Sequence, residues 1–566
     1  MNRSYATIVF NGEIYNFREC RKSLEKLGET FSSGSDTEVL LAGYLKWGIE
    51  HLLERIDGMF AFALYDEHLN TIFLCRDRLG KKPLYYYNNG EEFYFSSEIR
   101  SICKVVSELT VNFRAIDYYL SELAVPQPHS IWNEVKQVEP ATYLTINTSG
   151  KIIQRSYYKF AIARNLELSE KEILRLLKDK LTAAILLRTV ADVPIGCYLS
   201  GGVDSGLIVS LLATNSSDRV KTFSVGFLES EYNELNDAKK VALRYSTEHQ
   251  EIIVDPTASV NVIEDLLDYI GEPFADPSII PTYLISREIS SNVKVALSGD
   301  GGDEIFGGYG EFMTSYGADL YRFRHKSRIE QEIMSLTGSM KRKMFGRKND
   351  NSLYNSFLKQ DGEERLSKYM GFNQTQKRHL YNGKFAPFRD FTGEFINDKW
   401  EKNKSKHLTD ELFLTMMETR LLNNYLVKVD RMSMINSLEV RSPFLDTKLI
   451  EFAFSIPLNI LFGSGCSAKY LLKKLAEKLL DENVFSKKKK GFELPVRSWL
   501  RNELAGYVKS YLMSDSFRSQ KLFNHKYVSH ILNRHVSGHE DHTYRVWALL
   551  CMEVWRAKNK VDFNHL

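Results

Sequence analysis

The stretch Ser200-Gly201-Gly202-Val203-Asp204-Ser205 decides the fold class of this chain because of what stands on either side of it. An apolar run over Pro194–Leu199 predicts a strand before it, and a second apolar run over Gly206–Ala213 predicts a helix after it. Two glycines let the backbone approach a phosphate closely, and N–H groups at the start of a helix favour anions. The serine hydroxyls add donors, whereas Asp204 would repel a phosphate unless Mg²⁺ lay between them. We therefore predict a phosphate-binding loop in which Asp204 is a metal ligand.

Strand and helix signals alternate on both sides of this loop. Alternation of this kind predicts an α/β domain with a doubly wound parallel sheet. A flexible glycine–serine turn is the alternative for the loop taken alone, and the strand–loop–helix context weighs against it. The remainder of the chain, from about residue 310, has mainly helical patterns. Helices are predicted over Ser169–Val190 and Glu234–Tyr245, and strands over Thr222–Phe227, Glu251–Val254 and Lys294–Leu297.

A second glycine-rich loop, Ser298-Gly299-Asp300-Gly301-Gly302-Asp303-Glu304, follows the last of these strands. Ligands of α/β sheets bind beyond the carboxyl ends of the strands. Glycines and acidic residues at this place predict a loop that handles Mg²⁺ and an adenylate. An acidic solvated turn is the alternative for this loop alone, and it is less favoured beside the first loop. No Gly-Lys pair in the chain is followed by Ser or Thr, which argues against a P-loop kinase or ATPase.

Residues 1 to about 155 have a different, β-rich pattern. Short runs rich in Val, Ile, Phe and Tyr alternate with turn signals such as Asp66–Asn70 and Asn88–Gly90. A helix is predicted at Glu38–Trp47 between two of the runs. This pattern predicts antiparallel sheets with flanking helices. The runs predicted as strands are Ala6–Phe10, Met59–Tyr65, Thr71–Cys75, Pro83–Tyr87 and Glu92–Phe95.

The composition of the 566 residues argues against several classes of protein. Lys and Arg number 75 and Asp and Glu 72, and a net charge of +3 argues against a nucleic-acid partner or a membrane-surface partner. The six cysteines are scattered and form no Cys-x-x-Cys pair, which argues against zinc ribbons and disulfide frameworks and favours a reducing compartment. No apolar run approaches the roughly 18–20 residues that span a bilayer, and the first residues do not resemble a signal peptide. We therefore expect a cytoplasmic enzyme.

With both loops identified, the chain closely resembles the glutamine-hydrolysing asparagine synthetases. Its first loop resembles the pyrophosphate-binding loop of enzymes that cleave ATP to AMP and pyrophosphate. The resemblance runs nearly end to end, and so many spaced motifs in one order make it specific. Beyond the two loops it rests on Asn11-Gly12-Glu13-Ile14-Tyr15-Asn16, Gly34-Ser35-Asp36-Thr37-Glu38, Asp57-Gly58-Met59-Phe60-Ala61, Arg76-Asp77-Arg78-Leu79-Gly80-Lys81-Lys82-Pro83-Leu84-Tyr85, Ser96-Ser97-Glu98-Ile99 and Glu439-Val440-Arg441-Ser442-Pro443-Phe444-Leu445-Asp446.

The resemblance implies two domains. Residues 1–160 correspond to a glutaminase-like domain of the class II glutamine amidotransferases, an α+β αββα sandwich that is incomplete here. Residues 165–566 correspond to the ATP-pyrophosphatase domain, with a doubly wound parallel sheet and a helical C-terminal part. In the family, ATP and the side-chain carboxylate of aspartate give a β-aspartyl-AMP and pyrophosphate, and ammonia then displaces AMP. The implied cofactors are ATP and Mg²⁺, and the implied partners are aspartate, glutamine or ammonia, and a second copy in a homodimer.

The resemblance also assigns residues of the synthetase site. Asp204 and Asp303 are the expected Mg²⁺ ligands, and Asp300 is the acidic residue linked to formation of the acyl-adenylate. Lys469 matches a lysine that stabilises charge on the reacting phosphate, with a surface helix lysine as the alternative. Asp276 is expected to help bind substrate. The expected contacts with ATP and pyrophosphate are Ser200, Gly201, Gly202, Asp204, Ser205, Val225, Ser298 and Gly299.

The glutamine site implied by the resemblance is a remnant, formed by Asn11, Gly12, Glu13 and Asp36. In the family a cysteine directly after the initiator methionine attacks glutamine, whereas residue 2 of this chain is Asn2. Cys20 falls in a helix-like stretch and is not expected to replace it. Without a thiolate there is no covalent step, so we predict that the chain does not hydrolyse glutamine. A misplaced start codon or truncated gene is the favoured explanation, and use of free ammonia, or of ammonia from a partner, is the alternative. The missing strands are also expected to leave sheet edges exposed.

Several alternative functions remain open. A relative that amidates or cyclises another carboxylate, in β-lactam formation or cell-envelope amide formation, would share both loops. A tRNA-modifying pyrophosphatase would require a basic surface and often paired cysteines, and a decayed scaffold would not keep both loops.

His535, His539 and His542 have the spacing of metal ligands, but a structural role is favoured because no fourth ligand stands nearby. Lys487–Lys490 is interpreted as a structural or cleft-lining loop in preference to a nuclear signal.

Overall fold

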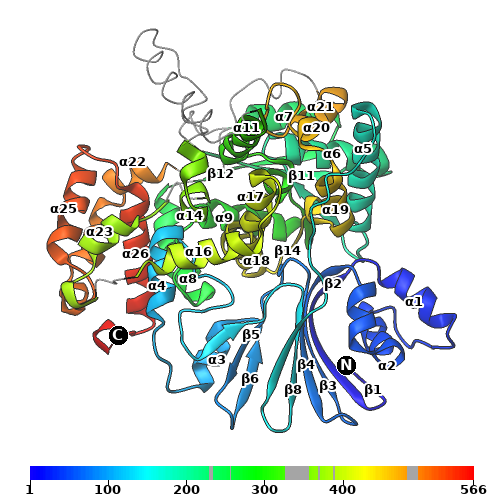
Figure 1. Cartoon of the computed structure of the whole chain (residues 1–566), viewed down its shortest axis with the longest axis horizontal. Helices are drawn as coiled ribbons and strands as arrows, with labels where there is room; N and C mark the ends of the chain where they lie inside the picture. Colours follow the sequence, from blue (N-terminus) through cyan, green and yellow to red (C-terminus); the bar gives the residue numbers. More distant parts are fainter. Residues whose placement is uncertain are drawn as a thin grey trace.

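The computed structural model describes residues 1–227, 234–254, 256–324, 356–366, 370–385, 389–480 and 495–565. Figure 1 shows the N-terminal strands, in blue and cyan, gathered on the lower side of the molecule, with a larger body of helices around a parallel sheet above them. The Lys487–Lys490 run lies outside the described residues.

An antiparallel six-stranded sheet forms the centre of the N-terminal half, in the order β1-β2-β3-β4-β8-β9. On β3, Phe60, Phe62 and Leu64 belong to the apolar cluster on one face, and Ala61 and Ala63 to the cluster on the other, as the two-residue period of a strand requires. The elements are β1 (Asn2–Arg3), β2 (Ala6–Ile14), β3 (Gly58–Asp66), β4 (Thr71–Arg76), β8 (Thr142–Asn147) and β9 (Ile152–Ser156), with helices α1 (Phe17–Glu25) and α2 (Asp36–Arg55) on the first face. β1 pairs with only the first residues of β2.

A three-stranded antiparallel sheet, in the order β6-β5-β7, packs on the second face of the large sheet. Tyr86 contacts the apolar cluster between the two sheets, whereas Tyr85 and Tyr87 contact the cluster that includes the next two helices. The side chains of β5 therefore join the large sheet to the helices beyond. The elements are β5 (Tyr85–Asn88), β6 (Phe93–Ser96), β7 (Val135–Gln137), α3 (Ile99–Val105) and α4 (Phe113–Glu122).

The second half of the chain contains a five-stranded parallel sheet in the order β12-β11-β10-β13-β14. The chain extends the sheet from β10 through β11 and β12 on one side and then crosses to the other side at β13. The strand order therefore reverses between β10 and β13, and loops that leave a sheet at such a point form a ligand-binding crevice. The prediction of an α/β fold with a parallel sheet is confirmed. The strands are β10 (Ile195–Tyr198), β11 (Lys221–Phe227), β12 (Glu248–Val254), β13 (Val295–Leu297) and β14 (Glu439–Arg441).

Helices cover both faces of this sheet. One apolar cluster joins α5 and α6 to Cys197 and Leu297, and another joins α9 to Phe223 and Ala296. β14 was not predicted, because its residues Glu439–Arg441 have two charged side chains around a single valine and therefore no apolar run. The helices of this part are α5 (Glu170–Leu187), α6 (Val203–Asn215), α7 (Leu235–Arg244), α8 (Pro256–Ile270), α9 (Ile279–Asn292), α10 (Gly302–Phe306) and α11 (Gly310–Arg324).

The rest of the described chain is helical apart from β14, as the sequence predicts. Its last long helix, α26 (Thr543–Lys558), returns to the N-terminal half, where the Tyr119 hydroxyl donates to the Ala548 carbonyl at 2.8 Å. The other helices are α14 (Gly362–Leu366), α15 (Gln374–Leu380), η2 (Gly383–Phe385), α16 (Phe391–Lys402), α17 (Leu408–Met416), the π-helix η3 (Met417–Tyr425), α18 (Leu426–Met434), η4 (Pro443–Leu445), α19 (Thr447–Ser455), α20 (Leu458–Leu461), α21 (Tyr470–Leu479), α22 (Val496–Arg501), α23 (Ala505–Leu512), α24 (Asp515–Ser519), α25 (His525–Val536) and η6 (Phe563–His565).

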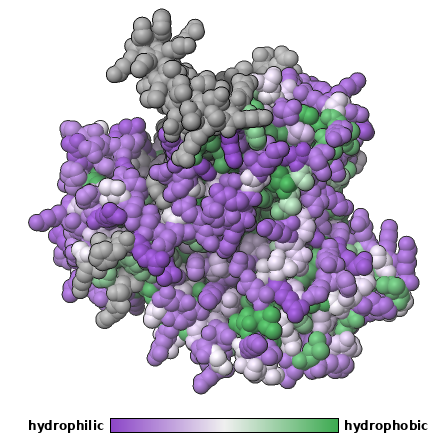
Figure 2. All heavy atoms as spheres, viewed as in Figure 1, coloured by the Kyte–Doolittle hydropathy of each residue, from purple (hydrophilic) through white to green (hydrophobic). Residues whose placement is uncertain are grey.

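The surface is mainly hydrophilic on the face shown in Figure 2, where apolar residues form small separate patches. Among the described helices, none is long and apolar enough to cross a membrane.

Candidate active site

The first glycine-rich loop joins β10 to α6 and is held by its two serines. The Ser205 hydroxyl accepts a hydrogen bond from the Ser200 N–H at 3.1 Å and lies 3.1 Å from the Ser200 hydroxyl. Gly201 has φ +73°, and a Cβ there would lie 2.8 Å from the Ala238 nitrogen. The loop therefore needs glycine at this position for both its backbone conformation and its packing. It places the N-terminus of α6, where the first N–H groups of a helix lack intrahelical acceptors, at the switch point of the sheet.

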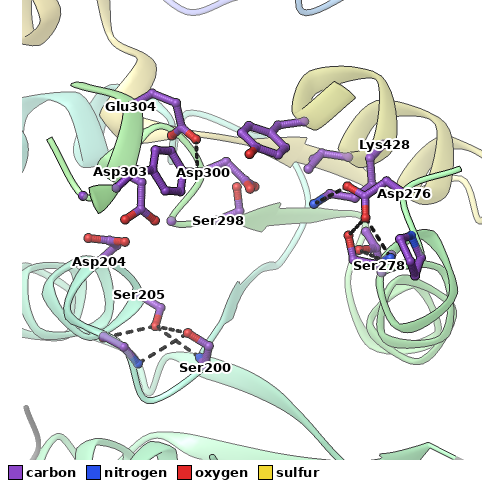
Figure 3. A pocket seen from close by; sticks show the side chains of 18 of the residues that line it. Ser200, Asp204, Ser205, Asp276, Ser278, Ser298, Asp300, Asp303, Glu304 and Lys428 are labelled. Atoms are coloured by element: carbon purple, nitrogen blue, oxygen red, sulfur yellow. Dashed lines mark hydrogen bonds and ion pairs between the residues drawn. The ribbon is translucent and has the colours of Figure 1, made fainter. Parts of the chain in front are cut away.

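The second glycine-rich loop leaves β13 and packs directly against the first. A Cβ at Gly302 would lie 2.7 Å from Cγ of Asp204, and a Cβ at Gly299 would lie 3.1 Å from Cβ of Asp204. Both distances are too short for an unshifted side chain. Glycine is therefore required where the two loops meet, and this contact brings the carboxylates of Asp204 and Asp303 to the same side of the cleft (Figure 3).

Lys469 lies between these two carboxylates. Its ammonium group forms ion pairs with Asp204 and, at 2.7 Å, with Asp303, and its side chain is 6% exposed. Burial by itself would lower the pKa of Lys469, but the two carboxylates outweigh burial and hold that pKa above its ordinary value. Lys469 precedes α21 with φ +52°, a left-handed conformation that is unusual for lysine. A Cβ at Gly308 would lie 2.6 Å from Cε of Lys469, so glycine is needed there as well.

These groups lie at one end of a cleft of about 900 Å³, and a different set of groups lies at the other end. Figure 3 shows Asp276, Ser278 and Lys428 together on one side, with Asp300 and Ser298 between them and Asp204. One Asp276 oxygen accepts hydrogen bonds from the Ser278 N–H at 2.9 Å and the Ser278 hydroxyl at 2.6 Å. The other Asp276 oxygen lies 3.6 Å from the Lys428 ammonium group. The cleft thus has one end with two carboxylates and one lysine, called the phosphate end below, and another end with one carboxylate and one lysine.

Glu304 is a buried acidic group beside the phosphate end. Burial raises the pKa of Glu304 to about 7, and Asp303 adds to that rise. The Tyr309 hydroxyl donates a hydrogen bond to Glu304 at 2.5 Å. Burial and the neighbouring Asp303 charge therefore both favour the protonated form of this carboxyl group.

The donor set at the phosphate end fits Mg²⁺. The ion is usually held by one or two carboxylates together with phosphate oxygens of the substrate, in contrast to an all-protein cage. Asp204 and Asp303 provide two carboxylates from two loops, and within the described ranges no three His, Cys, Asp or Glu side chains group as a ready-made metal site. These two residues would hold the ion, and its charge would neutralise phosphate oxygens.

The structure brings most of the residues predicted for the synthetase site to one cleft. The predicted residues that line it are Ser200, Gly201, Gly202, Asp204, Ser205, Asp276, Ser298, Gly299, Asp300, Asp303 and Lys469. Val225 does not line it. Val225 lies on β11, opposite Ile252 of β12, and packs against the apolar cluster around Phe223.

The residues of the predicted glutamine remnant lie outside this cleft, and each has a partner in the fold. The Asn11 amide donates to the Ser97 hydroxyl at 3.1 Å, and an Asp36 oxygen accepts from the Ile14 N–H at 3.1 Å. Gly12 has φ +141°, and a Cβ there would overlap the backbone of β3. A Glu13 oxygen lies 3.4 Å from Nη2 of Arg441.

Cys20 is buried on α1. Its burial raises the pKa of the thiol to about 11. Such a thiol is almost fully protonated at neutral pH and is therefore a poor nucleophile.

The three histidines make hydrogen bonds and contacts within their own segment of the fold. His535 is buried and accepts a hydrogen bond on Nδ1 from the His542 N–H at 3.1 Å. His539 lies 2.7 Å from the Ser537 hydroxyl, and the His542 ring lies 2.9 Å from Glu540. Burial lowers the pKa of His535 to about 4, so this ring is neutral at physiological pH.

Sequence reasoning missed a group of cleft residues that come from distant helices. They come from several segments that only the packing of the chain brings to the cleft, such as α18 with Lys428, α22 with Arg497 and α26 with Arg545. The clearest sequence signal was the histidine at position 542, which was interpreted as structural. The missed residues are Tyr309, Met370, Gly371, Tyr425, Lys428, Lys473, Arg497, Asp541, His542, Tyr544 and Arg545.

Comparison with known families agrees with this geometry. A family model described as asparagine synthase matches residues 176–557, and one described as a glutamine amidotransferase domain matches residues 1–158. The chain belongs to the asparagine synthase family. It is therefore a carbon–nitrogen ligase, and its two glycine-rich loops lie within the region that matches the asparagine synthase family.

Individual relatives extend the match over nearly the whole chain. Asparagine synthetase [glutamine-hydrolyzing] 1 of Bacillus subtilis is 32% identical over 559 residues, which cover 98% of this chain and 85% of that protein. A putative asparagine synthetase [glutamine-hydrolyzing] of Mycobacterium bovis is 30% identical over 97% of this chain and 84% of that protein. Among solved structures, glutamine phosphoribosylpyrophosphate amidotransferase from B. subtilis is 13% identical, with a TM-score of 0.21 over 53% of this chain and 57% of that one.

Proposed function

We propose that this chain makes asparagine from aspartate in an ATP-dependent reaction that passes through a β-aspartyl-AMP and releases AMP and pyrophosphate. The observation that carries the proposal is the cluster of Asp204, Asp303 and Lys469, which come from three separate segments and meet at the switch point of the parallel sheet. The relatives named asparagine synthetase support the acceptor and the product.

The phosphate end of the cleft is suited to the first half of the reaction. The N–H groups at the start of α6 and the hydroxyls of Ser200 and Ser205 are donors for the pyrophosphate oxygens. Lys469 remains protonated at working pH and stabilises the charge that develops as the bond to pyrophosphate breaks. When Mg²⁺ is bound by Asp204 and Asp303, its charge screens the phosphates from these same carboxylates.

The middle of the cleft is suited to the carboxylate that is activated. Asp300 and Ser298 lie between the phosphate end and the pair of Asp276 and Lys428 (Figure 3). An acceptor bound near this pair has its carboxylate directed at the α-phosphate, where Asp300 orients the forming acyl-adenylate. Ammonia then attacks the acyl carbon, the bond to AMP breaks, and a proton leaves the nitrogen.

We further propose that residues 1–160 form a glutaminase-like domain and residues 165–566 the synthetase domain. The family matches at 1–158 and 176–557 support this division, as does the change from antiparallel to parallel sheet. Ammonia is the nitrogen that the second half of the reaction consumes, whether it is supplied free or released from glutamine.

The test is AMP and pyrophosphate release by the purified chain with ATP, Mg²⁺, aspartate and ammonia. Asp204→Ala is expected to abolish AMP formation, and unchanged turnover would disprove the site assignment. Lys240→Ala, which removes an exposed lysine of α7 that pairs with Asp237, is a control for general damage. A panel of other carboxylates decides the acceptor, because activity with one of them and none with aspartate would favour a relative that amidates or cyclises another carboxylate.

A further inference from the structure

The segment Glu439–Asp446 lies between the two halves of the chain and touches both. It consists of β14 and the 3₁₀ turn η4, and it is called the bridging segment below. β14 is the edge strand of the parallel sheet beside β13, and Figure 1 shows it directly above β2 of the N-terminal half.

On one side, the bridging segment supports the second glycine-rich loop at two points. At the start of the loop, the Ser298 N–H donates to the Arg441 carbonyl at 3.0 Å, and the Ser298 hydroxyl lies 3.1 Å from the Ser442 hydroxyl. In the middle of the loop, the Leu445 side chain packs so closely on Gly301 that a methyl group there would overlap it. The position of Asp300 and Asp303 therefore depends on where this segment lies.

On the other side, residues of the N-terminal half hold the bridging segment. The Lys81 ammonium group donates to the Leu445 carbonyl at 2.9 Å. The Tyr15 ring lies 5.5 Å from the Arg441 guanidinium and 4.6 Å from that of Arg188, which in turn pairs with Asp446 at 3.0 Å. Leu445 is thus the residue that contacts Lys81 through its carbonyl and Gly301 through its side chain.

Lys81 is itself held rigidly by its own turn. One Asp77 oxygen accepts from the N–H groups of Leu79 and Lys81, each at 3.0 Å. The other Asp77 oxygen accepts from the N–H groups of Phe60 at 3.2 Å and Lys82 at 3.0 Å. The turn after β4 is therefore anchored to the central strand of the large sheet, and a rigid turn can fix the position of what Lys81 binds.

We propose that Lys81 is a positioning residue for the synthetase site, which holds the second glycine-rich loop in place through Leu445 of the bridging segment. This gives the Arg76–Tyr85 motif a role in the adenylation site, although Lys81 does not line the cleft. The inference rests on the proposed function only in its kinetic test, because that test measures ligase activity. It implies that the N-terminal half supports ligation even when ammonia is the nitrogen source.

The kinetic test uses ammonia, ATP and aspartate at pH 7 and compares Lys81→Met and Lys81→Arg with the unchanged chain. Lys81→Met is expected to lower kcat/KM for ATP about tenfold, the scale of a lost hydrogen bond from a charged donor, and Lys81→Arg to restore it to within about threefold. Arg100→Met is the matched control, since Arg100 is another N-terminal cation that contacts the second half, 3.6 Å from Asp268 on α8. It is expected to leave kcat/KM unchanged.

A second readout does not depend on turnover. Amide hydrogen exchange in a peptide that contains residues 298–304 is expected to be faster in Lys81→Met than in the unchanged chain, and unaltered in Arg100→Met. If the unchanged chain shows no ligase activity, the proposed function fails, while exchange still decides the positioning role. If Lys81→Met does not fold, Lys81→Gln replaces it in both assays.

Three outcomes would overturn the inference. One is equal kcat/KM and equal exchange in the Lys81 variant and the unchanged chain. Another is a lower melting temperature with both of these readouts unaltered, since that would show a purely structural lysine. The third is the same loss in Arg100→Met, which would show a general requirement for contact between the two halves.

Discussion

The cleft and the strand β2 both carry motifs that were predicted to bind substrates, but the fold uses their polar residues differently. In the cleft, two carboxylates and a lysine from three segments converge at the edge of an open cavity. On β2 and at the start of α2, Asn11 and Asp36 are bound to neighbouring residues of their own half. A matching motif is therefore more informative about chemistry where charged groups meet at a cavity than where each group has a separate partner.

The largest effect that tests this difference is expected at Lys469. Lys469→Met leaves two carboxylates facing each other and removes the charge that stabilises pyrophosphate departure, so kcat should fall about 10²- to 10³-fold. Lys474→Met, on the exposed side of the same helix α21, should retain activity and is the control. Both are measured as pyrophosphate release, and equal rates for the two variants would mean that the cleft is not the catalytic centre.

A smaller but still large effect is expected where the two loops meet. In Gly302→Ala the new methyl group would lie 2.7 Å from Cγ of Asp204 and push the loops apart, so we expect a loss of kcat/KM for ATP of about tenfold or more. Gly310→Ala is the matched control, since a Cβ there meets nothing within 4 Å. Full activity in Gly302→Ala would contradict the requirement for close contact between the loops.

At the other end of the cleft, Asp276→Asn should weaken acceptor binding. The substitution removes the negative charge beside Lys428 and should raise KM for the acceptor about tenfold, with little change in KM for ATP. Steady-state kinetics with each substrate varied in turn provide the measurement. A rise in KM for ATP alone would place Asp276 at the nucleotide and not at the acceptor.

The smallest effect is expected at Glu13 and concerns stability. Burial raises the pKa of Glu13 to about 7 from an ordinary value near 4.5, although Arg441 opposes that rise. The folded state therefore favours the neutral carboxyl, and the stability that Glu13 contributes is present below about pH 4.5 and is lost as pH rises through 7. Urea unfolding at several pH values should show this decline, and Glu13→Gln should flatten it. A decline of the same size in Glu13→Gln would assign it to other groups, and Glu19→Gln on the exposed face of α1 is the control.

Much of the fold follows from local patterns in the sequence. The strands β10, β11 and β13 and the helix α6 have long or strongly apolar runs, and the predicted ranges agree with the structure to within a few residues. The three-residue strand β14 was missed, because its pairing with β13 depends on residues about 140 positions earlier. The helix α2 is longer than predicted, since its second part continues past Gly48, where the backbone is not helical.

The candidate site likewise has one part that the sequence predicts and another part that only the folded structure reveals. Ser200–Ser205 and Ser298–Glu304 are recognisable because each loop follows an apolar strand, and their composition alone indicates phosphate and metal chemistry. The residues of α22 and α26 that line the cleft have no such context. Arg497 and Arg545 could not be identified from the sequence, because helices that lie far along the chain reach the cleft only through packing.

The sequence by itself determined that this chain is a member of the asparagine synthase family with two glycine-rich loops that each follow a strand, because these features depend on residues that are adjacent in the chain. Only the tertiary structure decided that Lys469 stands between Asp204 and Asp303, that glycine is needed where the loops touch, and that Lys81 reaches Leu445 across the two halves. These contacts join residues that are more than 90 positions apart, and the packing of the folded chain, not any local pattern, brings them together.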